Sequence, residues 1–301
     1  MGLVLSLDIL ADVSFVLIEP YVETTLGTAV VAPGSVTVSP PSMVGIYGGA
    51  VLVVGRGTPN LEAVTVTAIA ATTFTATFAN THASGDALNG ATFPSGLFTQ
   101  QEMLEYLYNA ENDFLVKTRP VFAQATKALT ANRYYSQPAD AIRIERISSS
   151  GKAWMDVSQL SLDMDNPNWQ SDHQSDDPKA WYQDEIGIDM FGIWPLTDLG
   201  GLVAELWYSQ KDLNSNMTFL STFILPDIFT MYLKYGVLAR AFAKDGEQRD
   251  DLRSKFCQKR FDFGVMLARM FLFASETLAT EMEADQGQMQ KFSPMMLSGG
   301  K

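Results

Sequence analysis

Two histidines and one cysteine are the residues of this 301-residue chain with the widest range of chemistry. His173 lies in the acidic segment DHQSDD, where a hydrolase would need a nucleophile oriented by the imidazole and a metal site would need a second soft ligand nearby. Neither accompanies it, so we interpret this segment as a solvated loop between Trp169 and Pro178. His82, in the segment THASG, is typical of a turn after a strand, and Cys257 beside Phe256 is typical of a helix core.

A carboxylate pair is the enzyme alternative that these residues leave open. Asp172, Asp176 and the Asp184-Glu185 pair are the candidates for such a hydrolase. Paired carboxylates do acid and base chemistry when burial moves their pKa values apart, whereas these lie in polar loop sequence. We therefore expect no enzyme, and assign no catalytic, cofactor-binding or metal-binding residue.

The composition describes a globular chain with a strong acidic excess. Apolar residues make up 47% and charged residues 18%, which excludes wholesale disorder, and the length favours about two domains. The net charge of −13 argues against a groove that grips nucleic acid phosphates. The single cysteine excludes an intrachain disulfide and a cysteine-based zinc cluster. The longest apolar stretch, residues 44–54, is too short to cross a membrane, and the apolar start lacks the basic residues of a signal peptide, so no membrane contact is expected.

The first 95 residues differ in amino-acid composition from the rest of the chain. They hold six acids and one base, and residues 28–93 are dense in Val, Thr, Ala and Gly. Residues 1–20 have the spacing of a helix. Alternating segments such as residues 62–78 predict five or six short strands between 21 and 95. We expect a small all-β barrel or sandwich inserted into a helical domain, and the fold class is α+β.

The remaining residues predict helices on either side of a mixed β region. Thr99 and Glu102 form a capping box for a helix that ends before Pro120. Strand patterns then occupy residues 121–210. A helix is expected from Pro226 to Gly246 and a second over 249–284, joined as an antiparallel hairpin. Its expected apolar stripe is Leu252, Phe256, Phe263, Leu267, Met270/Phe271 and Leu278. This second domain spans residues 96–285, and residues 286–301 are expected to be a flexible tail.

Basic residues gather on the predicted hairpin. Nine bases and five acids lie between Lys234 and Arg269, a local excess of four positive charges. One interpretation is the solvated face of two amphipathic helices, and the other is a subunit interface that meets an acidic neighbour. With the Met-rich tail, whose side chains adapt to irregular grooves, the candidate interface residues are Lys244, Arg249, Arg253, Lys255, Lys259, Arg260, Met289, Phe292, Met295 and Met296.

The order of features from Thr99 onward resembles the head–tail adaptor (connector) proteins of tailed bacteriophages. The leading helix carries Thr99, Glu102, Leu104, Tyr108 and the run 110–114 (AENDF). Next come Tyr135, Pro138, Asp140, Ile142-Arg143-Ile144 and Ile147, then Pro167, Trp169, Pro178 and the run 180–182 (AWY). The pattern closes with IWP at 193–195, ELWY at 205–208, Leu225-Pro226 and AFAKDGE at 241–247. Residues 62–68, 73–76 and 82–85 resemble a small β module that recurs in phage structural proteins; its inserted position is unusual for an adaptor.

The resemblance implies a structural virion protein made in the host cytoplasm and placed at the head–tail junction. Adaptors of this family form a ring under the portal protein, usually of twelve copies. The ring extends the channel for the genomic DNA and presents an attachment surface for a tail or nozzle protein. The partners implied are therefore the portal, a tail or nozzle protein and further copies of the chain, while DNA passes without sequence-specific binding. The alternative is another neck, tail-completion or baseplate component, followed by a hydrolase.

Overall fold

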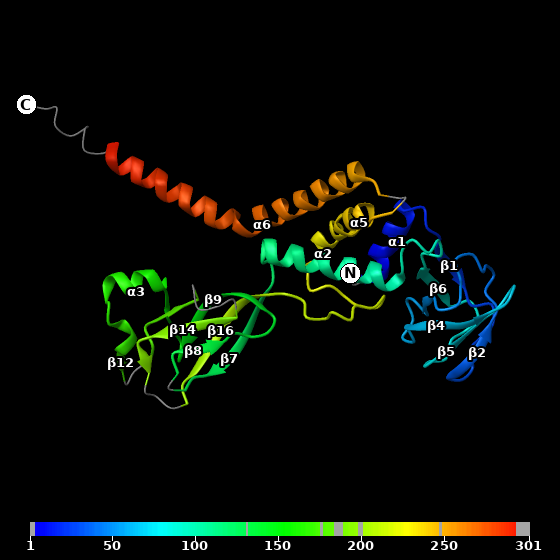
Figure 1. The fold of residues 1–301 in the computed structure, drawn as a ribbon, viewed down its shortest axis with the longest axis horizontal. Coiled ribbons are helices and arrows are strands. Elements are labelled where there is room, and N and C mark those ends of the chain that lie inside the picture. Colours follow the sequence, from blue (N-terminus) through cyan, green and yellow to red (C-terminus); the bar gives the residue numbers. More distant parts are fainter. Residues whose placement is uncertain are drawn as a thin grey trace, which may run out of the picture.

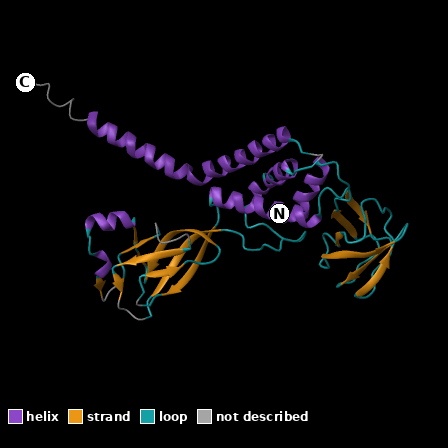
Figure 2. Ribbon diagram, in the orientation of Figure 1, coloured by secondary structure: helices purple, strands orange, loops and turns teal. Residues whose placement is uncertain are grey.

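The computed structural model describes residues 4–130, 132–174, 177–183, 189–197, 201–246 and 249–292, with backbone alone for residue 174 and residues 273–292. Three parts follow one another across Figure 1. The second β region of the chain, drawn in green, lies at the left, a group of helices lies in the middle, and a six-stranded sheet, drawn in blue, lies at the right. Apart from α3 (Gln159–Asp165), which lies with the second β region, the helices lie apart from the largely antiparallel sheets, as Figure 2 shows. The fold is therefore α+β, as predicted.

The first sheet is antiparallel and lies between two helices in the sequence. Its order is β1-β6-β3-β4-β5-β2. Val64 and Val66 of β4 are buried while their neighbours Ala63 and Thr65 are exposed, which is the alternation that predicted this strand. The strands are β1 Tyr21–Thr25, β2 Gly34–Val38, β3 Val51–Val54, β4 Glu62–Ile69, β5 Phe74–Phe78 and β6 Ala87–Ala91.

Five helices pack around a second core, the helical body. Leu10 of the first helix, Leu107 of the second and Val237 of the fifth are all fully buried in it. The ring of Phe114 lies 5.9 Å from that of Phe229 and 5.8 Å from that of Phe261, centroid to centroid, and joins three helices. The helices are α1 Ser6–Val16, α2 Gln100–Thr118, α4 Asp227–Thr230, α5 Leu233–Ala243 and α6 Asp251–Phe292.

Both ends of α2 lie where the sequence predicted them. The Thr99 hydroxyl accepts a hydrogen bond from the amide of Glu102 at 3.1 Å, as an N-cap should. At the other end Arg119 adopts a left-handed conformation with φ 52° and donates its amide to the Leu115 carbonyl. The helix thus ends before Pro120, which disfavours helical geometry in the residue that precedes it.

The second β region contains two four-stranded sheets, ordered β10-β9-β16-β7 and β11-β13-β14-β8. Ile147, Trp181 and Leu206 are buried in their shared core. Gly192 of β14 lies so close to Tyr182 that a Cβ would come within 2.2 Å of its ring. The elements are β7 Phe122–Ala128, β8 Tyr134–Ser136, β9 Ala141–Ser149, β10 Lys152–Ala153, β11 Met155–Asp156, α3 Gln159–Asp165, a short 3-10 turn Trp169–Ser171, β12 His173–Gln174, β13 Ala180–Tyr182, β14 Met190–Trp194, β15 Leu196–Thr197 and β16 Val203–Gln210.

The helix predicted from Pro226 to Gly246 is interrupted. α4 ends at Thr230 and α5 starts at Leu233, with a tight turn between them in which the Tyr232 amide bonds to the Phe229 carbonyl. Tyr232 packs against Gly264 of α6, where a Cβ would lie 2.4 Å from its ring. A contact between segments this far apart in the chain leaves no trace in local periodicity.

The end predicted for the last helix was also wrong. α6 continues to Phe292, so residues 286–292 are helical where an extended tail was expected. Four of these seven residues are Gln or Lys, which favour helices and offset the cost of Gly287. Residues 293–301, with Met295 and Met296, lie outside the described residues.

Candidate functional site: the exposed face of the last helix

One face of α6 belongs to the helical body. Cys257, Phe261, Val265 and Ala268 are each 6% exposed or less, and burial raises the pKa of the Cys257 thiol. With 3.6 residues per turn these positions form one stripe, which packs against α5 and α2. The sequence prediction that Cys257 is a core residue is confirmed.

The opposite face carries a second apolar stripe, and it is open to solvent. Its side chains are between 46% and 81% exposed. They recur at alternating spacings of four and three residues, with Lys259 in the one polar place of the series. We call this set the α6 seam: Leu252, Phe256, Lys259, Phe263, Met266 and Met270.

The seam corrects the prediction that the larger apolar residues of this helix form its packed side. Leu252, Phe256, Phe263, Met270 and Phe271 were expected inside, and all are exposed. The stripe that contains Cys257, Phe261 and Ala268 is buried instead, and Gly264 beside it lets Tyr232 approach closely. Counting large apolar residues selects the wrong face when a helix has two apolar stripes.

Three of the predicted interface bases are engaged within the chain. Lys244 donates to the Glu102 carboxylate at 2.7 Å and lies over the ring of Phe98. Arg249 contacts Asp245 at 2.7 Å and Asp251 at 2.9 Å, and its guanidinium lowers the pKa of the Asp251 carboxyl. Arg253 pairs with Asp250 at 3.3 Å and lies over the ring of Phe242.

The other three bases line the seam. Lys255 and Lys259 are exposed, and among the described residues neither makes an ion pair or hydrogen bond. Arg260 is exposed as well and stacks on Phe256, 5.3 Å from the ring centroid. Met289 and Phe292 belong to the last turns of α6, for which only the backbone is described. The structure therefore brings positive charge and exposed apolar surface together on the first half of α6.

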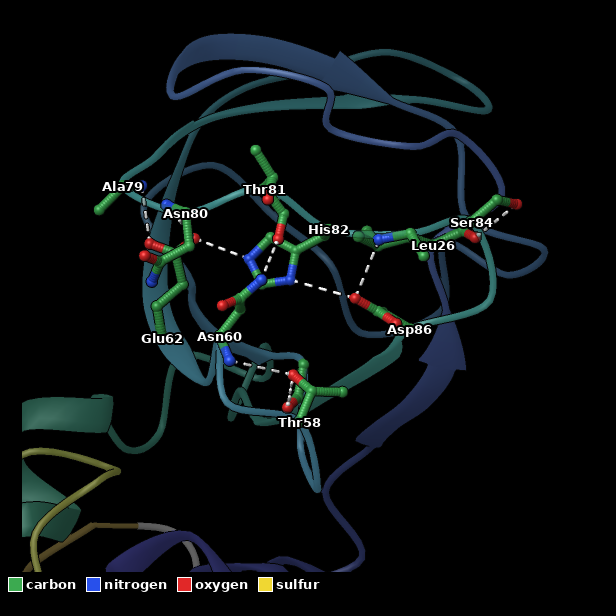
Figure 3. Close-up of polar contacts among 12 residues, drawn as sticks. Leu26, Thr58, Asn60, Glu62, Ala79, Asn80, Thr81, His82, Ser84 and Asp86 are labelled. Atoms are coloured by element: carbon green, nitrogen blue, oxygen red, sulfur yellow. Dashed lines mark hydrogen bonds and ion pairs between the residues drawn. The ribbon is translucent and has the colours of Figure 1, made fainter.

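His82 follows β5, as its sequence context predicted, but it lies in an isolated bridge with Val30 and its side chain is buried. Its ring is buried between two carboxylates, with Nε2 2.7 Å from Glu62 Oε1 and Nδ1 3.3 Å from Asp86 Oδ2, as Figure 3 shows. Glu62 also accepts hydrogen bonds from the amides of Ala79 and Asn80. The cluster ties the start of β4 to the loop after β5, and no nucleophile that is described points at the imidazole. Its role is to hold the sheet together.

The acidic segment around His173 contributes backbone pairing. β12 pairs in parallel with β15, and His173 is exposed. The carboxylate of Asp172 accepts hydrogen bonds from Asn166 at 2.7 Å and from the indole of Trp194 at 3.1 Å. The other acids of the hydrolase alternative, Asp176, Asp184 and Glu185, lie outside the described residues.

Glu111 is a buried carboxylate that sequence analysis did not single out. It lies in α2, fully buried, and Oε1 accepts the amides of Ile224 at 2.8 Å and Leu225 at 3.2 Å. Oε2 has no hydrogen-bond partner in the described structure. Burial raises the pKa of Glu111 to about 7, aided by Asp212 and opposed by the two amides. The residue anchors the connection between β16 and α4 to the helical body.

Within the described residues, no cluster of three His, Cys, Asp or Glu side chains is arranged to hold a metal ion. No described helix combines the length and hydropathy required to cross a bilayer. The feature of α6 that stands out is an exposed apolar stripe edged by positive charge, on a helix whose far half leads away from the rest of the molecule (Figure 1).

Comparison with known proteins agrees with a role in assembly. No curated protein matches the chain. The family model described as SU10 adaptor protein matches residues 79–270, from the end of the first sheet to the exposed seam of α6. Since this match covers more than half of the sequence, the chain belongs to the SU10 adaptor protein family.

Proposed function

We propose that this phage adaptor protein forms a ring, of twelve copies, below the portal at the head–tail junction. The family match over residues 79–270 carries the proposal. The ring extends the DNA channel and presents the attachment surface for a tail or nozzle protein. The exposed α6 seam supports the proposal, because monomeric proteins rarely expose an apolar surface of this length, and such surfaces mark sites of protein–protein contact.

The charge of the chain suits a channel wall. With a net charge of −13 it offers DNA phosphates little attraction, so the genome passes without being held at each step. Here the first sheet, residues 21–91, acts as an inserted module at the edge of the adaptor. α1 supports the insertion, because it packs in the helical body beside α2 and α5 although the whole sheet separates it from α2 in sequence.

The chain end is the proposed portal contact. Residues 293–301 follow α6 and contain Met295 and Met296, whose flexible side chains suit an irregular groove. Deleting residues 293–301 is expected to weaken portal binding. Substituting Met43, which packs against the core of the first sheet, with Leu provides a control with unchanged binding.

The test is the native mass of the purified chain, alone and mixed with the portal protein encoded by the same genome. A complex in which the chain joins a portal ring in a fixed ratio, with twelve copies per ring, is the expected result. A chain that remains at 33.1 kDa in the presence of portal rings would overturn the proposal. Electron microscopy of the mixture shows whether the added density continues the portal channel.

A further inference from the structure

The α6 seam has the residue pattern of a coiled-coil surface. Positions 252, 256, 259, 263, 266 and 270 alternate steps of four and three residues, which keeps one stripe facing a partner helix. All of them are apolar except Lys259, and all are exposed in the single chain. A single polar residue in such a stripe fixes the register of the pair.

The second half of the same helix repeats this pattern. Leu278, Met282, Asp285, Met289 and Phe292 follow the same steps of four and three, again with one polar residue in the third place. If the second half of α6 from one copy is aligned in parallel with the seam of another copy, Leu278 lies opposite Leu252 and Asp285 lies opposite Lys259. The polar residue of each series then meets a residue of opposite charge, and every other position pairs apolar with apolar.

The charges beside the two series are also complementary. The seam is flanked by Arg253, Lys255 and Arg260, and the acids nearest to it, Asp251 and Asp262, pair with Arg249 and Lys117. Residues 274–290, in contrast, hold four acids and no base. One copy cannot make this contact with itself, because both series lie on the single helix Asp251–Phe292 and its second half leads away from the body, as Figure 1 shows.

We propose that the second half of α6, residues 278–292, docks in parallel on the α6 seam of the next copy of the chain. Each copy then offers a seam to one neighbour and a helix end to the other, a head-to-tail contact that closes into a ring when the rotation between copies allows. The inference rests on the proposed ring and names the surface that builds it. Lys259 and Asp285 set the register by pairing across the contact.

The experiment uses the full chain and sedimentation at rising protein concentration. Phe256→Asp places a charge in the seam and is expected to weaken self-association at least about tenfold. Leu160→Asp is the matched control, because Leu160 is also exposed, at 62% against 56% for Phe256, but lies on α3, outside the seam. Circular dichroism checks that both variants remain folded.

Mixing variants tests the head-to-tail arrangement. Phe256→Asp removes the seam and Met282→Asp removes the docking half, so neither variant is expected to associate alone. Their equimolar mixture is expected to form a one-to-one dimer, because one chain still offers a seam and the other a helix end. A reversal of charge at one position, Lys259→Glu, should weaken association, and adding Asp285→Lys should restore it.

Three results would overturn the proposal: a wild-type chain that stays monomeric, a wild-type chain that stops at a dimer, or a Phe256→Asp variant that associates like wild type. A stop at the dimer would indicate an antiparallel, mutual pairing of two helices. A chain that binds the portal but fails these tests would leave the proposed function standing while its ring is built by another surface.

Discussion

Glu62 in the first sheet and Glu111 in the helical body are both buried carboxylates, at 9% and 0% exposure, but their surroundings differ. Glu62 meets the His82 ring and two backbone amides, so both of its oxygens have partners. Glu111 meets two amides through one oxygen, while the other has none in the described structure. The first sheet gives partners to both oxygens of its carboxylate, whereas the described part of the helical body gives a partner to only one oxygen of Glu111. The first sheet and the helical body should therefore lose stability for different reasons.

Removing the histidine is expected to have the largest effect. His82→Leu leaves Glu62 and Asp86 without their shared hydrogen-bond partner inside the sheet, and each buried group that loses such a partner costs about 1–3 kcal/mol. Hydrogen exchange of strands β1 to β6, resolved by mass spectrometry, measures the loss where it occurs. His173→Leu is the matched control, because His173 is exposed and such substitutions change stability by about 0.5 kcal/mol or less. Equal effects of the two substitutions would show that the buried cluster does not hold the sheet.

Glu111 is expected to make the stability of the chain depend on pH, with an effect similar in size to that of His82→Leu. Its folded pKa of about 7 lies above the ordinary 4.5, so the folded state holds the proton more tightly. Stability from this group is complete below pH 4.5 and is lost as pH rises through 7, a change of about 3 kcal/mol. Urea unfolding of wild type and Glu111→Gln at a series of pH values isolates it. The stability of wild type relative to the variant should fall between pH 4.5 and 7, and a constant difference would contradict the prediction.

Short-range sequence patterns correctly predicted the elements whose formation depends on residues close together in the chain. The alternation in β4 and the N-cap at Thr99 are confirmed because each depends on residues a few positions apart. The break at Tyr232 escaped prediction, since it lies at a contact with Gly264 that only the folded chain creates.

The candidate sites were harder to predict for the same reason. His82 looked like a turn residue because Glu62, twenty positions earlier, gave no local sign of facing it. Glu111 looked like one more charge on an amphipathic helix, and only the returning segment at Ile224 and Leu225 buries it. On α6 both stripes are visible in the sequence, but which one faces the body depends on how closely α5 and α2 approach.

The smallest expected effect comes from a third glutamate, Glu102, on the same helix as Glu111. Burial alone would raise its pKa, but hydrogen bonds from Lys244 and Tyr106 outweigh burial and lower the pKa below 4.5. Its contribution is therefore present above pH 4.5 and is lost as pH falls, opposite in sign to that of Glu111.

Lys244→Met removes the charge while keeping an unbranched side chain near the ring of Phe98. A partly exposed pair of this kind contributes less than about 1 kcal/mol. The variant should lose this amount near neutral pH, and once Glu102 is protonated it should lose only the part that comes from the hydrogen bond of Lys244 to the Leu97 carbonyl. Urea unfolding at both ends of the pH range measures the two values. A loss that is equally large in acid would assign the effect to packing and to the Leu97 hydrogen bond, and not to the ion pair. Since this measurement uses the isolated chain, it also separates the internal role of Lys244 from any contact with a partner. Lys244 contacts Glu102, so its substitution should change the stability of the chain in the absence of the portal. Substitution of Lys255 or Lys259 at the seam should leave that stability unchanged.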